Sequence, residues 1–213
     1  MGERHIFLRF ERCNIHCEYC DEIDKPGFEM ELETVLSKIK TFEQEDGPHA
    51  FVSLTGGEPL VYSSFLKELC PALVREGFLL YLETNGILWK ALKEILPWVR
   101  VIAMDLKPAS VTKDKTFMDE HRRFLEIAKT KETFIKIVIS KEIDIAEFRD
   151  LCELVRSVHP LAPVILQPIS TKEREGYEDP ELMRLLEELR RIASGSLRDV
   201  RIVPRLHKIL GIR

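Results

Sequence analysis

The stretch RCNIHCEYCD, Arg12–Asp21, places three cysteines, Cys13, Cys17 and Cys20, in the spacing C-x3-C-x2-C. Three thiolates on one short loop can bind three irons of a [4Fe–4S] cube and leave the fourth iron open to a small molecule. A cube that only carries electrons normally takes four cysteine ligands, and no fourth cysteine stands near this loop. The spacing therefore predicts a catalytic iron–sulfur site.

Two other uses of these cysteines compete with a cluster. His16 would complete a Cys3His zinc set, but structural zinc sites usually draw their ligands as two pairs separated by a longer span. The odd cysteine count and the lack of a signal peptide disfavour a disulfide framework. The remaining cysteines, Cys70 and Cys152, lie in apolar helical patterns, and we predict that both are buried without a ligand role.

The composition is that of an ordinary globular protein. The chain has 213 residues, 45% of them hydrophobic and 32% charged, which allows one sizeable core, so we expect a single domain over 1–213. The net charge of −4 gives no overall basic field that would attract nucleic acid. No apolar run reaches the length of a membrane span. Clustered free cysteines are typical of a reducing compartment, so we expect a cytoplasmic protein.

Strand-like and helix-like patterns alternate along the chain. Amphipathic helical spacing covers 32–42 and 182–192; Asp144 with Glu147 predicts a capping box, and Asp179 followed by Pro180 predicts a helix start. Repeated β-α units indicate an α/β fold with a parallel sheet, curled or open, and helices outside it. The predicted strands are Ile6–Phe10, Phe51–Leu54, Phe78–Leu82, Val101–Met104, Phe134–Ile139, Val164–Leu166 and a weaker Val200–Val203.

Polar motifs follow these strands at the ends where such folds gather their ligands. Cys13–Cys20 follow the first strand. The other motifs are TGGEP (Thr55–Pro59), ETNG (Glu83–Gly86), DLKP (Asp105–Pro108) and QPIS (Gln167–Ser170). Because the ends of parallel strands meet at one edge of the sheet, these motifs describe a pocket.

The three-cysteine loop followed by a GGEP turn resembles the radical S-adenosylmethionine (radical SAM) superfamily. The resemblance implies a partial (β/α)6-type barrel of parallel strands with outer helices. It implies that the cysteines hold the cube and that Gly56, Gly57 and Glu58 bind the amino group of S-adenosylmethionine. In this superfamily one electron from the cube cleaves S-adenosylmethionine to methionine and a 5′-deoxyadenosyl radical.

Further segments resemble the 7-carboxy-7-deazaguanine synthases, which are small members of this superfamily. The segments are FLRFERCNIHCEYCD, SLTGGEPL, YLETNG, FIKIVIS, LQPIS and VPRLHKILGIR. The resemblance implies a lyase that converts 6-carboxy-5,6,7,8-tetrahydropterin to 7-carboxy-7-deazaguanine, with ring contraction and loss of ammonia, for queuosine-type 7-deazapurine synthesis. It also implies an electron donor such as flavodoxin or ferredoxin, and a homodimer.

The same resemblance assigns site residues beyond the cluster loop. Arg9, Thr84 and Arg213 match substrate-contacting positions, and the tail 196–213 is expected to close over the site. Arg9 as an ordinary surface arginine, and Asp105 paired with Lys107 on a solvated loop, stay open as alternatives. The positions that match the S-adenosylmethionine site are Tyr19, Asp21, Gly86, Asp105, Leu106, Lys107, Gln167, Pro168, Ile169 and Ser170.

The substrate side departs from the pattern of the synthases. Glu22 stands where they have a threonine that helps to hold Mg²⁺, Arg205 stands where glutamine is usual, and Arg213 stands where proline commonly ends the chain. The synthases also have a segment before the residues that match the start of this sequence. Glu22 either keeps Mg²⁺ as a hard-cation ligand, or pairs with an arginine of the tail after the cation is lost.

Three other functions compete with the synthase. A glycyl-radical-enzyme activase shares the cysteine spacing, but the LHKILG tail argues against it. A radical SAM enzyme of the same shape with another small-molecule substrate also fits. A non-catalytic iron–sulfur or zinc module leaves the GGE and QP motifs unexplained.

Overall fold

The predicted strand–helix alternation folds into one sheet of seven parallel strands that follow one another in chain order, β1 to β7. The structure is a computed structural model that describes residues 3–20, 27–170 and 176–204. The strands are β1 His5–Phe10, β2 Phe51–Gly56, β3 Leu80–Thr84, β4 Val99–Leu106, β5 Glu132–Ile139, β6 Val164–Pro168 and β7 Val200–Ile202.

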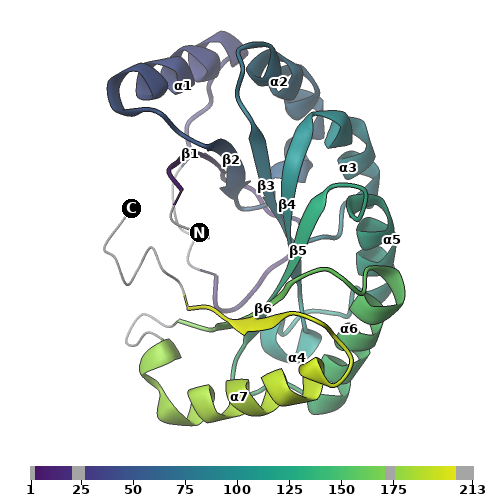
Figure 1. Ribbon diagram of the computed structural model, residues 1–213. Helices are drawn as coiled ribbons and strands as arrows, with labels where there is room; N and C mark the ends of the chain where they lie inside the picture. Colours follow the sequence, from purple (N-terminus) through teal and green to yellow (C-terminus); the bar gives the residue numbers. More distant parts are fainter. Residues whose placement is uncertain (1–2, 21–26, 171–175, 205–213) are drawn as a thin grey trace.

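Helices connect these strands and cover the outer, convex face of the curled sheet (Figure 1). They are α1 Leu32–Asp46, α2 Ser63–Arg75, α3 Trp89–Ile95, α4 Ala109–Thr112, α5 Met118–Ala128, α6 Ile145–Val158 and α7 Pro180–Ser194, with short 3-10 turns at Pro59–Tyr62, Leu96–Trp98 and Gly176–Glu178. This arrangement is the predicted α/β barrel with outer helices, and the weak seventh run is a real strand that pairs with β6.

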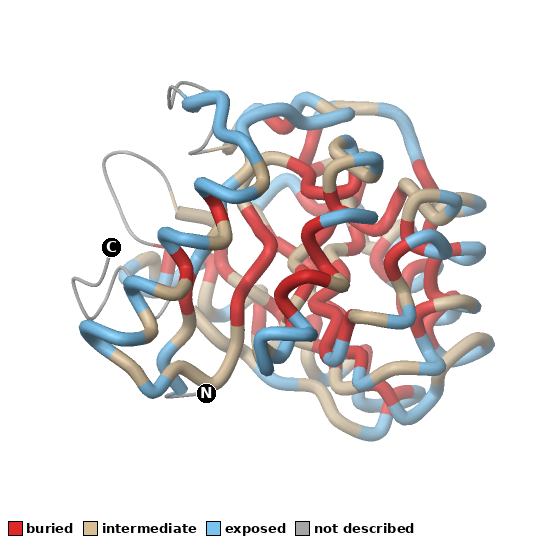
Figure 2. The backbone as a smooth tube through the Cα atoms, turned by 90° about the horizontal axis from the view of Figure 1, so that it is seen from above, coloured by how far each residue is buried: buried red, intermediate tan, exposed pale blue. Residues whose placement is uncertain are grey.

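The main core lies between the sheet and the helices, where alternate strand residues such as Leu54, Leu82 and Ile102 are fully buried. In Figure 2 the buried residues gather in the interior of the molecule and the exposed residues lie on its outside. Because side chains alternate along a strand, the residues between them face the concave side. Cys70 in α2 and Cys152 in α6 are buried in this core, as predicted, and burial raises the pKa of each thiol to about 12.

Aromatic rings cover the concave face near the amino-terminal ends of the strands. The His5 ring lies 5.1 Å from that of Phe51, and Tyr81 lies 5.9 Å from Phe51 and 6.1 Å from Phe134, measured between ring centroids. Pairs at these separations attract beyond their buried area. These rings line the barrel on the side away from the strand ends that carry the polar motifs.

One predicted strand begins two residues late, at Leu80 instead of Phe78. The cause is the end of α2, where Gly77 has a φ of +91°. The N–H of Gly77 donates to the carbonyl of Val74 and that of Phe78 to the carbonyl of Leu73, at 3.0 and 3.1 Å. These two bonds form a Schellman motif. Because the N–H of Phe78 is used to end the helix, the strand begins after this residue.

The two predicted helix starts differ. Asp179 caps α7 as expected, because its Oδ1 accepts from the N–H groups of Glu181 and Leu182. Asp144 also accepts from the N–H of Glu147, at 2.8 Å. The capping box itself was a wrong prediction, because the Glu147 carboxylate does not return to Asp144 but binds the start of α4.

The predicted tail 196–213 belongs partly to the sheet, since β7 lies within it. Residues 205–213 lie outside the described residues, so closure of the tail over the site stays a prediction. No helix in the described ranges is both long and apolar enough to cross a membrane.

Candidate functional site

The cysteine loop leaves the end of β1 and is held against the end of β2 by backbone hydrogen bonds. The N–H of Gly57 donates to the carbonyl of Phe10 at 2.6 Å, and that of Glu58 donates to the carbonyl of Arg12 at 2.8 Å. Gly56 has a φ of +107°, and a side chain at Gly56 or Gly57 would collide with the backbone of residues 9–12. The glycines therefore allow close approach of the cysteine loop itself, directly before Cys13.

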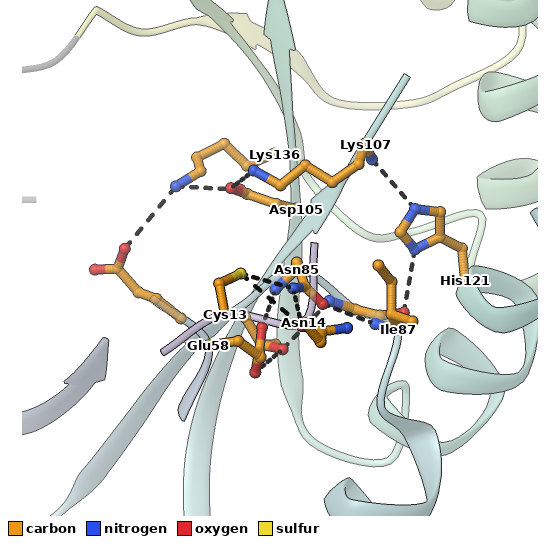
Figure 3. A network of polar contacts seen from close by, with 12 residues as sticks. Cys13, Asn14, Glu58, Asn85, Ile87, Asp105, Lys107, His121 and Lys136 are labelled. Atoms are coloured by element: carbon orange, nitrogen blue, oxygen red, sulfur yellow. Dashed lines mark hydrogen bonds and ion pairs between the residues drawn. The ribbon is translucent and has the colours of Figure 1, made fainter. Parts of the chain in front are cut away.

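Asn85 connects the end of β3 to this loop. Its Nδ2 donates to Oδ1 of Asn14 at 2.7 Å and approaches Sγ of Cys13 at 3.7 Å, as Figure 3 shows. Asn85 was not among the predicted site residues, although it is the third residue of the ETNG motif. The sequence signal was present, but contact with a cysteine loop 71 residues away depends on the fold.

Glu58 is fully buried and accepts three hydrogen bonds. Its Oε1 accepts from the N–H of Leu60 and the hydroxyl of Thr84, and its Oε2 accepts from the N–H of Asn85 at 2.7 Å. Burial raises its pKa to about 7, and the donated bonds act against this shift. In this structure the carboxylate joins the ends of β2 and β3; a direct contact between Glu58 or Thr84 and a ligand stays a prediction.

A charged row crosses the concave face from β3 to β5. Asp105 pairs through Oδ2 with Lys107 at 3.0 Å and through Oδ1 with Lys136 at 3.1 Å, and Lys136 lies 3.9 Å from Glu83. The predicted alternative of an Asp105–Lys107 pair is confirmed, but the solvated loop is wrong, because the two side chains are only 16% and 12% exposed.

The charges of this row depend on one another. Burial disfavours the charged form of Asp105, but the ammonium groups of Lys107 and Lys136 hold its pKa below the ordinary value. Burial likewise opposes the charge of Lys107, whereas Asp105, Tyr19 and Cys17 hold its pKa well above the ordinary value. The row therefore keeps charged groups next to the cysteine loop.

His121 of α5 was missed by sequence reasoning, since one histidine in an amphipathic helix carries no signal. It is 1% exposed and lies between two predicted cofactor positions. Its Nδ1 lies 3.1 Å from the carbonyl of Gly86, and its Nε2 accepts from the N–H of Lys107 at 3.2 Å. Burial lowers the pKa of His121 to about 4, so the ring is neutral and donates from Nδ1 to Gly86.

Glu147 of α6 fixes the loop that follows the row. Its carboxylate accepts from the N–H groups of Ala109 and Ser110 at 2.6 and 3.0 Å, and from the Ser110 hydroxyl at 2.6 Å. A carboxylate on free N–H groups is a strong bond. Two outer helices, α5 and α6, thus hold the segment that begins at Asp105.

The other predicted site residues occupy the same end of the sheet. Arg9 is exposed on β1, with its guanidinium 5.3 Å from the Phe7 ring centroid. Leu106 is buried, Gly86 has a φ of +68°, and Gln167, Pro168, Ile169 and Ser170 lie at the end of β6. Asp21, Glu22, Arg205 and Arg213 lie outside the described residues.

Tyr19 lies between the cysteine loop and the charged row. The Lys107 ammonium is 5.7 Å from its ring centroid, a distance at which the ring face attracts a cation. Burial raises the pKa of Tyr19 to about 12. Its hydroxyl is buried and forms no well-aligned hydrogen bond with a described residue.

The donor set fits a cube in its chemistry, because a cube takes one thiolate per iron and the three cysteines share one loop. Within the described ranges no group of three or more His, Cys, Asp or Glu side chains is placed to hold a single metal ion. Burial raises the pKa of the Cys13 and Cys17 thiols, and binding to iron would draw off their protons.

Comparison with known proteins places this arrangement in a family. Residues 8–155 match the Radical SAM superfamily. A 7-carboxy-7-deazaguanine synthase from Geobacter sulfurreducens is 34% identical, over 99% of this chain and 91% of the relative. The chain belongs to this radical SAM family. A second family member, a 7-carboxy-7-deazaguanine synthase from Methanopyrus kandleri, is 31% identical over 99% of this chain and 87% of its own.

The fold agrees with this family. The structure of Streptococcus suis SuiB bound to S-adenosylmethionine matches with a TM-score of 0.67 and 15% identity, over 95% of this chain and 50% of that chain. Membership makes the chain a radical SAM lyase and implies a [4Fe–4S] cluster and S-adenosylmethionine as cofactors. The expected superfamily and synthase family are thereby confirmed.

Proposed function

We propose that this chain converts 6-carboxy-5,6,7,8-tetrahydropterin to 7-carboxy-7-deazaguanine, with radical ring contraction and release of ammonia, in 7-deazapurine synthesis. The main support is the relative of that name, which aligns over 91% of its length at 34% identity. The structure adds buried polar side chains at the end of the sheet where such folds carry their active sites.

Cys13, Cys17 and Cys20 would hold the cluster, and the ends of β3, β4 and β6 would hold S-adenosylmethionine. When bound, these cofactors supply a 5′-deoxyadenosyl radical that takes hydrogen from the substrate. Tyr19 and the Asp105–Lys107 pair stand beside the cysteine loop, on the side where this proposal places S-adenosylmethionine.

The chain's other contribution is the packing below the polar strand ends, where aromatic rings line the concave face. His121 fixes two cofactor-lining segments relative to each other.

The substrate contacts in this proposal are Arg9 and Thr84, with Arg213 from the tail. Mg²⁺ held by Glu22 is included, and it rests on sequence alone because Glu22 lies outside the described residues. A protein electron donor and a homodimer complete the proposal.

The test is anaerobic incubation of the reconstituted, reduced protein with the pterin and S-adenosylmethionine, followed by mass detection of a deazapurine. Cys17→Ala, which removes one thiolate, is the matched control and should give no product. Cleavage of S-adenosylmethionine by the wild type without any deazapurine would contradict the proposed substrate while leaving the radical SAM activity intact.

A further inference from the structure

Three exposed cations surround one indole ring on the outer helices. The Nζ atoms of Lys90 and Lys93 and the guanidinium carbon of Arg123 lie 5.4, 5.1 and 5.5 Å from the Trp89 ring centroid. Lys90 and Lys93 belong to α3 and Arg123 to α5, and all three are exposed. We call these four residues the Trp89 patch.

The Trp89 patch is locally unneutralised. None of its three cations is within 4.0 Å of an acid in the described part of the chain. Glu94 of the same helix pairs with Lys67 instead. The face of the indole ring attracts each cation, but the three cations repel one another, most strongly at low ionic strength. The positive charge of the patch is opposite in sign to the net charge of the whole chain, which is −4.

A short stretch of chain joins this patch to the cysteine loop. Trp89 begins α3, four positions after Asn85, whose side chain approaches Sγ of Cys13 at 3.7 Å. The N–H of Trp89 donates to the carbonyl of Ile87 at 2.9 Å, which tightens the connection. The Trp89 patch therefore begins only four residues along the chain from a side chain that contacts the cysteine loop.

We propose that the Trp89 patch is the docking surface for an acidic one-electron carrier protein that reduces the cluster. The carrier supplies one electron: the anionic hydroquinone of a flavodoxin becomes its neutral semiquinone, and the cluster gains the electron. Complementary charge steers such encounters and raises the association rate. The inference depends on the cluster of the proposed function but not on its pterin substrate.

The experiment uses the cluster-loaded protein and an acidic flavodoxin reduced to its hydroquinone, without pterin. Stopped-flow absorbance follows cluster reduction in wild type and in the double variant Lys90→Glu with Lys93→Glu. The variant should be reduced about tenfold more slowly by flavodoxin at low salt. Added salt should slow the wild type and should speed the variant, because salt screens the repulsion between its reversed charges and the acidic flavodoxin. Dithionite, a small reductant, should reduce both proteins at the same rate.

The matched control reverses two exposed lysines elsewhere, Lys38→Glu with Lys129→Glu, which changes the net charge equally. The docking surface is confirmed if only the patch variant loses flavodoxin-driven reduction. An unchanged rate in the patch variant, or an equal loss in the control, would overturn it. An equal loss with dithionite would overturn it as well, since the variant would then act on the cluster.

Discussion

The Nε2 atom of His121 accepts a hydrogen bond from the backbone N–H of Lys107, so a histidine of the outer helical layer fixes a residue of the charged row. This bond requires the neutral ring, because a protonated ring has no acceptor nitrogen. The other ring nitrogen donates to Gly86. One buried ring thus sets the spacing between the ends of β3 and β4.

Acid should weaken the fold through this ring. The pKa of His121 is about 4 in the folded protein, against about 6.5 in an unfolded chain. The unfolded state therefore binds the proton first, and stability present above pH 6.5 is lost as the pH falls towards 4, by about 3 kcal/mol at most. Glu58, with a raised pKa of about 7, contributes the opposite slope.

The comparison of His121→Gln with wild type isolates this effect. Anaerobic denaturant unfolding between pH 4 and 7.5 should show a flatter pH dependence in the variant, because glutamine does not titrate. Parallel curves for the two proteins would show that His121 does not gain a proton on unfolding. Binding of S-adenosylmethionine should weaken in His121→Ala and be partly restored in His121→Gln.

Cluster binding should depend on the three loop cysteines alone. Cys13→Ala, Cys17→Ala and Cys20→Ala should each lose the iron after anaerobic reconstitution, because three thiolates are the whole predicted ligand set. Cys70→Ala and Cys152→Ala should keep it, with a loss of stability of about 1 kcal/mol from the small cavity. Iron analysis per chain decides, and loss of iron in either buried-cysteine variant would refute the ligand assignment.

A methyl group at Gly57 should disturb the cysteine loop. Its Cβ would collide with the backbone of Glu11 and Arg12, so Gly57→Ala should lower both iron content and S-adenosylmethionine binding. Gly195→Ala is the control, because its φ of −68° suits any residue. Normal iron content in Gly57→Ala would mean that the loop can move aside without cost.

Asp105 should be the most costly member of the charged row to neutralise. Asp105→Asn leaves Lys107 and Lys136 without their shared partner, and removal of one member of a buried pair typically costs 3–5 kcal/mol. Asp199→Asn breaks an exposed pair with Arg201 and should cost far less. Denaturant unfolding measures both costs. If the two variants lose the same free energy of unfolding relative to wild type, the charged row is not effectively buried.

Mg²⁺ should raise activity on the pterin. A carboxylate at Glu22 is a hard-cation ligand, and Glu22→Thr should keep the response because the synthases use a threonine there. Assays of both proteins with Mg²⁺ and with a chelator decide. A wild type that ignores Mg²⁺ would instead favour a partner such as Arg205 or Arg213.

The sequence predicted the strands, their common direction and the placement of five motifs at one end of the sheet, because β-α periodicity and strand-end motifs are local patterns. It missed residues whose role depends on contacts across the fold. Lys136 stands alone among the apolar residues of FIKIVI, which is a signal for a charge facing the inside of a barrel. His121 and Glu147 look like ordinary helix residues, and only packing of α5 and α6 brings them to the loop after β4.

The ratio of deazapurine to ammonia tests most directly whether this chain contracts a pterin ring. The reduced protein is incubated with 6-carboxy-5,6,7,8-tetrahydropterin and S-adenosylmethionine, and the deazapurine and the ammonia are quantified together. The proposed reaction predicts equal amounts of both, each matching the pterin consumed. Accumulation of 5′-deoxyadenosine with intact pterin and no ammonia would contradict it.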